Sequence, residues 1–361
     1  MFRVVCLPMS YRRRKTVIHQ YINNGYYIVL DVNSGSVHSV DPLLYDVISF
    51  LSERIPDSEK PFQIAQSLKD ETAAALKEKY SQEEIREAFE DIQELIDQEE
   101  LFTADIYKNF VMDFKKRQTV VKALCLHIAH DCNLACQYCF AEEGEYHGRR
   151  ALMTFEVGKK ALDFLIANSG NRRNLEVDFF GGEPLMAMDT VKKTVEYARS
   201  IEEEYDKCFR FTITTNGVLL DDENIEYINR EMSNAVLSID GRKEVNDDLR
   251  PTVNGKGSYD VIVPKFQKLI EGRGTKDYYL RGTFTRFHQD FAEDVKALAS
   301  IGRNISVEPV VGKEDDPYAL QEADLPALKA EYERLAEYLR DHPETNFFHF
   351  NVDLAQGPCV I

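Results

Sequence analysis

The sequence predicts an α/β fold in two parts: a small module of three strands and three helices, followed by an open partial (β/α)6 barrel. From residue 123 onward, short apolar segments alternate with amphipathic segments at helical spacing, which indicates parallel strands joined by helical crossovers. Before residue 100, three strand-like segments precede three helical ones. Six β/α units are fewer than the eight of a closed TIM barrel, so we expect an open sheet with ligands at the carboxyl ends of its strands.

The first part is predicted to be a winged-helix-like module. Turn residues such as Asn23-Asn-Gly25 separate its short strand candidates. The first helix begins at Asp41-Pro42, a capping acid followed by a proline in the first turn. The second helix carries Ile64, Leu68 and Leu76, and the third begins with the capping box Ser81 to Glu84. The strand candidates are residues 17–22, 26–32 and 36–40.

Charge decides which partners this module fits. A winged-helix layout often binds DNA, but the net charge of the chain is −18 and the third helix carries seven acids against Arg86. Nucleic acid is therefore excluded as a partner, because its binding depends on the neutralisation of phosphate. The acidic helix is either a solvated surface, or it flanks a strand edge at residues 36–40 that accepts an extended peptide as an added strand.

The barrel elements follow from periodicity. Helices are expected at residues 154–168, 189–207 and 324–339. The strand candidates are residues 123–128, 175–180, 209–214, 235–239, 279–285 and 305–311.

Three cysteines follow the first barrel strand at CxxxCxxC spacing: Cys132, Cys136 and Cys139. A [4Fe-4S] cluster normally takes four cysteines, so this loop leaves one iron open to a ligand that is not protein. A structural zinc site is the alternative, but it needs a fourth ligand, and the chain has no second closely spaced pair. His127 and His130 lie at the end of an apolar segment, where we expect them to pack or hydrogen-bond. The iron–sulfur interpretation is favoured.

The second barrel strand runs into Gly181-Gly-Glu-Pro184. Glycines without a Cβ allow backbone to approach a ligand closely. By itself this segment is a plausible strand-to-helix turn. Its position, one strand–helix unit after the cysteine loop, supports a role in ligand binding.

Later strands also end in polar residues, each of which has an alternative interpretation as a turn residue, a cap or a buried polar group. These segments are Thr214-Thr-Asn-Gly217, Ser238-Ile-Asp-Gly241, Arg281 to Thr285 and Val307-Glu-Pro309.

The cysteine loop and the Gly-Gly-Glu-Pro segment closely resemble those of the radical S-adenosylmethionine (SAM) enzymes. The resemblance implies that SAM chelates the open iron of a [4Fe-4S] cluster. It also implies that Gly181, Gly182, Glu183 and Pro184 receive the SAM amino group, with Glu183 as the matching carboxylate. By the same resemblance, Ser238 and Arg250 are expected to contact the ribose and the carboxylate of SAM. The sixth strand, with Glu308, is expected to pack against the adenine, and Tyr138 to flank it. Further SAM contacts are expected from Thr214, Asn216 and Asp240.

A narrower resemblance rests on residues 26–35, 127–134 and 178–185, which look like the maturases of SCIFF peptides. Those enzymes carry a cysteine-rich C-terminal SPASM domain and form a thioether between a cysteine and a carbon of another residue, through a 5′-deoxyadenosyl radical. The resemblance implies a cysteine-rich precursor peptide and an electron donor such as ferredoxin or flavodoxin as partners. Two alternatives remain open: another radical SAM/SPASM maturase of the sulfatase type, and a truncated, non-catalytic peptide-binding protein.

The expected domain order follows from these segments. Cys359 looks like the first cysteine of the SPASM domain, so we expect the chain to be truncated and its auxiliary [4Fe-4S] clusters to belong to the missing part. The predicted divisions are a tail at 1–16, the recognition domain at 17–102, a linker at 103–122, the radical SAM barrel at 123–345 and the start of a SPASM domain at 346–361.

Composition predicts the compartment. No segment approaches the ~18 uninterrupted apolar residues of a membrane span. Seven cysteines, three of them clustered, argue against a disulfide framework. We therefore expect a cytoplasmic enzyme with no membrane contact.

Overall fold

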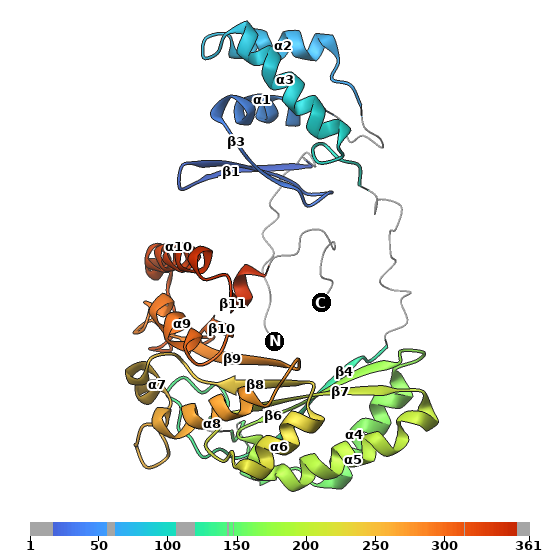
Figure 1. Cartoon of the computed structure of the whole chain (residues 1–361), viewed down its shortest axis with the longest axis vertical. Coiled ribbons are helices and arrows are strands. Elements are labelled where there is room, and N and C mark those ends of the chain that lie inside the picture. The colour runs from blue at the N-terminus through green and yellow to red at the C-terminus, as the bar shows by residue number, and fades with distance from the viewer. Residues whose placement is uncertain are drawn as a thin grey trace. The chain divides into compact units, whose positions relative to one another are not determined.

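The structure is a computed structural model that describes residues 17–55, 62–105, 120–142, 144–146, 148–313 and 315–351. The chain divides into two compact units, which are described separately (Figure 1). Within the described residues the N-terminal unit covers 17–105 and the barrel unit covers 120–351. The expected tail at 1–16, most of the expected linker and Cys359 lie outside the described residues. Among the described residues, no helix has the length and apolar character needed to cross a membrane.

The N-terminal unit packs three helices against an antiparallel sheet with the strand order β1-β2-β3. Every element lies on its predicted segment, except that α2 begins after Ile64. The turn between β1 and β2 has positive φ at Asn24 (50°) and Gly25 (79°), as an Asn-Gly hairpin requires. The elements are β1 (Ile18–Asn23), β2 (Tyr26–Asp31), β3 (Val37–Val40), α1 (Pro42–Ser52), α2 (Gln66–Leu76) and α3 (Gln82–Asp97).

Predicted caps define the ends of these helices. Asp41 accepts a hydrogen bond from the Leu44 amide at 2.8 Å, and Ser81 and Glu84 form the reciprocal capping box. The buried face of α3 carries Ile85 and Phe89 at helical spacing, which leaves its acids toward solvent.

The barrel unit contains the open parallel sheet that the sequence predicts. Its six long strands are neighbours in chain order, and two short strands extend the sheet to the order β11-β10-β9-β8-β7-β6-β4-β5. Among the described strands of this sheet, only β5 (Ala151–Leu152) is antiparallel to its neighbour. With two residues each, β5 and β11 (Asn346–Phe347) are too short to show a period in the sequence. The long strands are β4 (Ala123–His130), β6 (Asn174–Gly181), β7 (Cys208–Thr215), β8 (Asn234–Ser238), β9 (Asp277–Phe284) and β10 (Asn304–Pro309).

Helices cover one face of this sheet, as α4, α5, α6 and α8 show in Figure 1. Alternate strand residues such as Val177, Phe211 and Leu280 are fully buried on that face. Their neighbours Asp178 and Arg281 belong to the opposite, polar face and are exposed. The helical elements of this unit are α4 (Phe155–Asn168), η1 (Pro184–Ala187), α5 (Met188–Tyr205), α6 (Asp222–Glu231), α7 (Lys243–Leu249), α8 (Tyr259–Glu271), α9 (Phe291–Ala299), η2 (Glu322–Asp324), α10 (Leu325–Asp341) and η3 (Phe348–Phe350).

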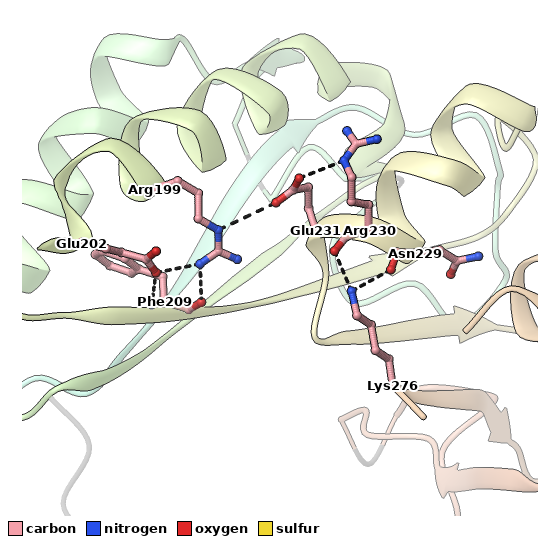
Figure 2. Close-up of polar contacts among 7 residues, drawn as sticks. All are labelled: Arg199, Glu202, Phe209, Asn229, Arg230, Glu231 and Lys276. Atoms are coloured by element: carbon pink, nitrogen blue, oxygen red, sulfur yellow. Dashed lines mark hydrogen bonds and ion pairs between the residues drawn. The ribbon is translucent and has the colours of Figure 1, made fainter. Parts of the chain in front are cut away.

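A polar network ties the helices to the amino-terminal ends of the strands (Figure 2). Glu202 accepts hydrogen bonds from the Phe209 amide at 2.6 Å and from Arg199 at 2.7 Å. Lys276 donates to two carbonyl oxygens in the last turn of α6, those of Asn229 and Arg230. These contacts satisfy a helix C-terminus at the end of the sheet opposite the cysteine loop.

Candidate functional site

The three predicted metal-binding cysteines lie on one loop after β4 and line a single pocket. The Gln137 amide donates to the carbonyl oxygen of Leu249 at 2.9 Å, which fastens this loop to the end of α7. All three thiols are free. Burial raises the pKa of Cys132 to about 12 and also raises the pKa of Cys136, so metal binding would displace protons from these thiols.

The donors around this loop fit a cluster better than a single ion. Among the described residues, no three His, Cys, Asp or Glu side chains are placed to hold one metal ion. Cysteines of a [4Fe-4S] cluster bind different irons and need not converge on one point. His127 and His130 pack against the ring of Tyr146, with centroids 4.6 and 5.1 Å away, and so confirm the predicted packing role.

Gly181, the last residue of β6, and Gly182 also line the pocket, and the neighbouring backbone gives a further reason for glycine at both positions. A Cβ on Gly182 would lie 2.1 Å from the carbonyl oxygen of Asp131, and one on Gly181 would lie 2.4 Å from that of Ala129. The Gly182 amide donates to Ala129 at 2.7 Å. Close approach of the backbone at the end of β4 and at the start of the cysteine loop therefore requires these glycines, whether or not a ligand is bound.

Glu183, the predicted carboxylate for the SAM amino group, is fully buried and does not belong to the pocket lining. Its carboxylate accepts hydrogen bonds from the Leu185 amide (2.9 Å), the Thr215 hydroxyl (2.8 Å) and the Asn216 amide (2.7 Å). Burial raises the pKa of Glu183, and these donors oppose that effect. Glu183 thus joins the loops after β6 and β7. Pro184, the first residue of η1, is also buried outside the pocket lining.

Tyr138, Asp240 and Arg250 form a buried group at the pocket wall. The Tyr138 hydroxyl donates to the Asp240 carboxylate, 2.9 Å from each oxygen, and accepts from Arg250 at 2.8 Å. Burial raises the pKa of Asp240 and of Tyr138. Tyr138 and Arg250 line the pocket, whereas Asp240 lies behind them. The Arg250 Nε is buried and has no partner among the described residues, so it is a free donor for an anionic group.

The remaining predicted residues divide between the pocket and another position. Thr214, Asn216 and Ser238 line the pocket. Glu308 does not: it accepts from the Ser306 hydroxyl at 2.6 Å and lies 2.8 Å from His349 Nε2. The Glu308–His349 pair has no signal in the sequence, because the two residues are 41 positions apart and belong to no recognisable motif.

Pocket residues that the sequence analysis did not single out are mostly apolar. Phe140 and Phe180 stand next to the last cysteine and to Gly181, so their adjacency to known motifs was the available signal. The missed lining residues are Leu134, Phe140, Ala141, Gly144, Phe180 and Thr215.

Comparison with known proteins identifies the region around this pocket. Residues 126–280 match the model of the Radical SAM superfamily. An uncharacterized protein, MJ0907 of Methanocaldococcus jannaschii, is 35% identical over 139 residues, covering 38% of this chain and 45% of that protein. The radical SAM cyclopropyl synthase TigE of Paramaledivibacter caminithermalis is 26% identical over 187 residues, 48% of this chain and 38% of TigE. A serine-type anaerobic sulfatase-maturating enzyme of Bacteroides thetaiotaomicron is 34% identical over 149 residues, 39% of this chain and 33% of that enzyme.

The chain spans less than half the length of these relatives. Among solved structures, native anSMEcpe with bound AdoMet and the Cp18Cys peptide superposes with a TM-score of 0.53 at 19% identity, covering 64% of each chain. This likeness concerns the fold.

Proposed function

Because residues 126–280 form a Radical SAM superfamily domain, we propose that the chain is a maturase that modifies a ribosomally made peptide with a [4Fe-4S] cluster and SAM. The observation that carries the proposal is the shared pocket of Cys132, Cys136 and Cys139, with Gly181 and Arg250 in its lining. When bound, the reduced cluster and SAM supply a 5′-deoxyadenosyl radical. The protein supplies binding and orientation.

The pocket residues divide these tasks. Arg250 offers its partnerless Nε to the carboxylate of SAM, while Tyr138 and Asp240 hold the guanidinium in place. The Gly181–Gly182 backbone at the pocket is proposed for the SAM amino group, and the Ser238 hydroxyl for the ribose.

The proposed peptide site is the free edge of β3. The Asp31 amide donates to the Ser36 carbonyl oxygen, so this pair is hydrogen-bonded within the β2–β3 ladder. Because such pairs alternate in antiparallel sheets, the amides of Val37 and Ser39 face away from β2. Among the described residues no strand pairs with this edge. An extended peptide would find two donors and two acceptors there.

The finer proposal is that the substrate is a cysteine-rich SCIFF-type precursor and that the product is a thioether. It rests on the sequence resemblance in residues 26–35, 127–134 and 178–185. A cytoplasmic location, a ferredoxin or flavodoxin donor, auxiliary clusters and the predicted domain boundaries belong to the same proposal.

Anaerobic reconstitution tests the cluster. We expect about four iron and four sulfide per chain in the wild type. Cys136→Ala should lose the cluster, because two thiolates cannot retain it. Cys208→Ala is the matched control, since this cysteine lies at the start of β7 and does not line the pocket. A full iron complement in Cys136→Ala would contradict the assignment of the loop.

The reaction is tested by incubating the reconstituted chain with SAM, dithionite and a cysteine-rich peptide. Formation of 5′-deoxyadenosine tests radical chemistry, and peptide mass with a free-thiol assay tests the product. Loss of two hydrogens and of one thiol with retention of sulfur supports the thioether. Loss of sulfur would instead support sulfatase-type oxidation, and absence of deoxyadenosine would reject the enzyme proposal.

Peptide binding is tested at Ser39. Ser39→Pro should weaken binding because it removes the outward amide, whereas Ser39→Ala keeps this amide and should bind like the wild type. Amide exchange provides a second measurement: bound peptide should protect Val37 and Ser39. Equal affinities of the two variants would exclude strand addition at this edge.

A further inference from the structure

We propose that Asn216, supported by Asn133, sets the reduction potential of the cluster through a hydrogen bond to Cys132. The inference rests on the proposed function, in which this loop holds a [4Fe-4S] cluster. The Asn216 Nδ2 lies 3.6 Å from the Cys132 Sγ and 2.8 Å from the Asn133 Oδ1. The sequence had suggested that Asn216 contacts SAM. The geometry directs its side chain toward the cysteine loop.

The orientation of the Asn216 amide follows from its partners. The Val218 amide lies 3.1 Å from the Asn216 Oδ1 and can only donate, so the oxygen must face Val218. The Nδ2 must then face Cys132 and Asn133. The Asn216 backbone is also fixed, because its amide donates to Glu183 at 2.7 Å, and the residue is only 5% exposed.

Asn133 completes the arrangement. Its Oδ1 accepts from Asn216, which leaves its own Nδ2 buried without a partner among the described residues. A buried donor without a partner carries a free-energy cost. Asn133 is the residue after Cys132, so an acceptor arriving with the cluster, a thiolate or an inorganic sulfide, would remove this cost. Asn133 thus positions the amide of Asn216, which lines the pocket.

Hydrogen-bond donors to sulfur change the reduction potential of the cluster, because the reduced cluster carries one more negative charge than the oxidised one. A hydrogen bond to sulfur stabilises the more negative form and raises the reduction potential. Hydrogen bonds to charged groups are stronger than those between neutral groups, and only part of their strength differs between the two oxidation states. Loss of the Asn216 donor should therefore lower the ratio of reduced to oxidised cluster about tenfold at a fixed potential, equivalent to about 59 mV for one electron.

The experiment is a redox titration of the full, reconstituted chain, with the reduced cluster followed by its electron paramagnetic resonance signal. Asn216→Ala is neutral and removes the donor, so its midpoint potential should fall while its iron content stays at the wild-type level. Asn216→Ser restores a hydroxyl donor and should recover part of the shift. The matched control is Asn234→Ala at the start of β8, which does not line the pocket and should leave the potential unchanged.

The outcomes separate this inference from the proposed function. If the wild type takes up no iron, the proposed function fails. If the wild type loads and Asn216→Ala has the same potential, the inference is overturned. Should Asn216→Ala fail to retain a cluster, the potentials of Asn216→Ser and Asn133→Ala decide: both below the wild type support the inference, and both equal to it refute it.

Discussion

Gly182→Ala should detach the cysteine loop from the end of β6. The new Cβ would lie 2.1 Å from the Asp131 carbonyl oxygen and 2.6 Å from its carbonyl carbon, both backbone atoms that no rotamer can move. Separation of the two segments would break the hydrogen bonds Gly182 to Ala129 (2.7 Å) and Glu183 to Asp131 (2.9 Å). The loop would then lose its position relative to the strand ends that complete the pocket.

The magnitude follows from these contacts. Two backbone hydrogen bonds at ~1 kcal/mol each, with ~1–3 kcal/mol for overpacking, give a loss of about 3–5 kcal/mol in the free energy of unfolding. This is a large share of the ~5–15 kcal/mol that stabilises a typical domain. Urea denaturation of the apo-protein measures the loss, and iron content after reconstitution, which should fall well below the wild type, measures the effect on the site.

Gly255→Ala is the control for this prediction. Gly255 has φ of +72°, and no atom lies within 4 Å of the place that a Cβ would occupy. Its substitution therefore costs only the ~1–2 kcal/mol of a left-handed backbone and leaves cluster loading intact. If Gly182→Ala is as stable as Gly255→Ala and loads a full cluster, the steric argument is refuted.

Three further predictions follow from individual contacts. Arg250→Lys should weaken SAM binding about tenfold at unchanged iron content, because the ammonium has no equivalent of the partnerless Nε; equilibrium dialysis with the loaded protein measures it, and unchanged affinity would contradict the role. Partial burial raises the pKa of Glu308, but hydrogen bonds from Ser306 and His349 outweigh this effect and hold the pKa below its ordinary 4.5. The ionised carboxylate therefore stabilises the folded state above about pH 4.5, and this contribution is lost as the pH falls through the lowered pKa of the folded state. Glu308→Gln should flatten the acid side of the stability profile, and an unchanged profile would count against the pair. Arg199→Ala should cost about 1 kcal/mol in urea denaturation and leave iron content unchanged, since its contacts lie at the opposite ends of the strands; a loss of cluster would show that the two ends are coupled.

Most of the strands and helices, and their order, could be predicted from local patterns in the sequence. Strand and helix periods are local, so the six long strands and the three helices predicted at residues 154–168, 189–207 and 324–339 lie within a few residues of their predicted limits. The CxxxCxxC spacing likewise identified three thiols that share one pocket. The α/β fold is confirmed, and residues 126–280 match the model of the Radical SAM superfamily. The SCIFF substrate, the thioether and the domain limits stay predictions.

The contacts of the polar residues of the site could not be predicted in this way, because they depend on the tertiary structure. Gly182 meets the backbone of Asp131, Glu183 meets the loop after β7, and Glu308 pairs with His349. Asn216 meets Cys132 across 84 positions of chain. Such contacts depend on which strands are neighbours, on their register and on the packing of the loops between them. The periodic pattern of a strand predicts which face of the sheet a side chain lies on, but it does not predict which group of another strand or loop that side chain contacts.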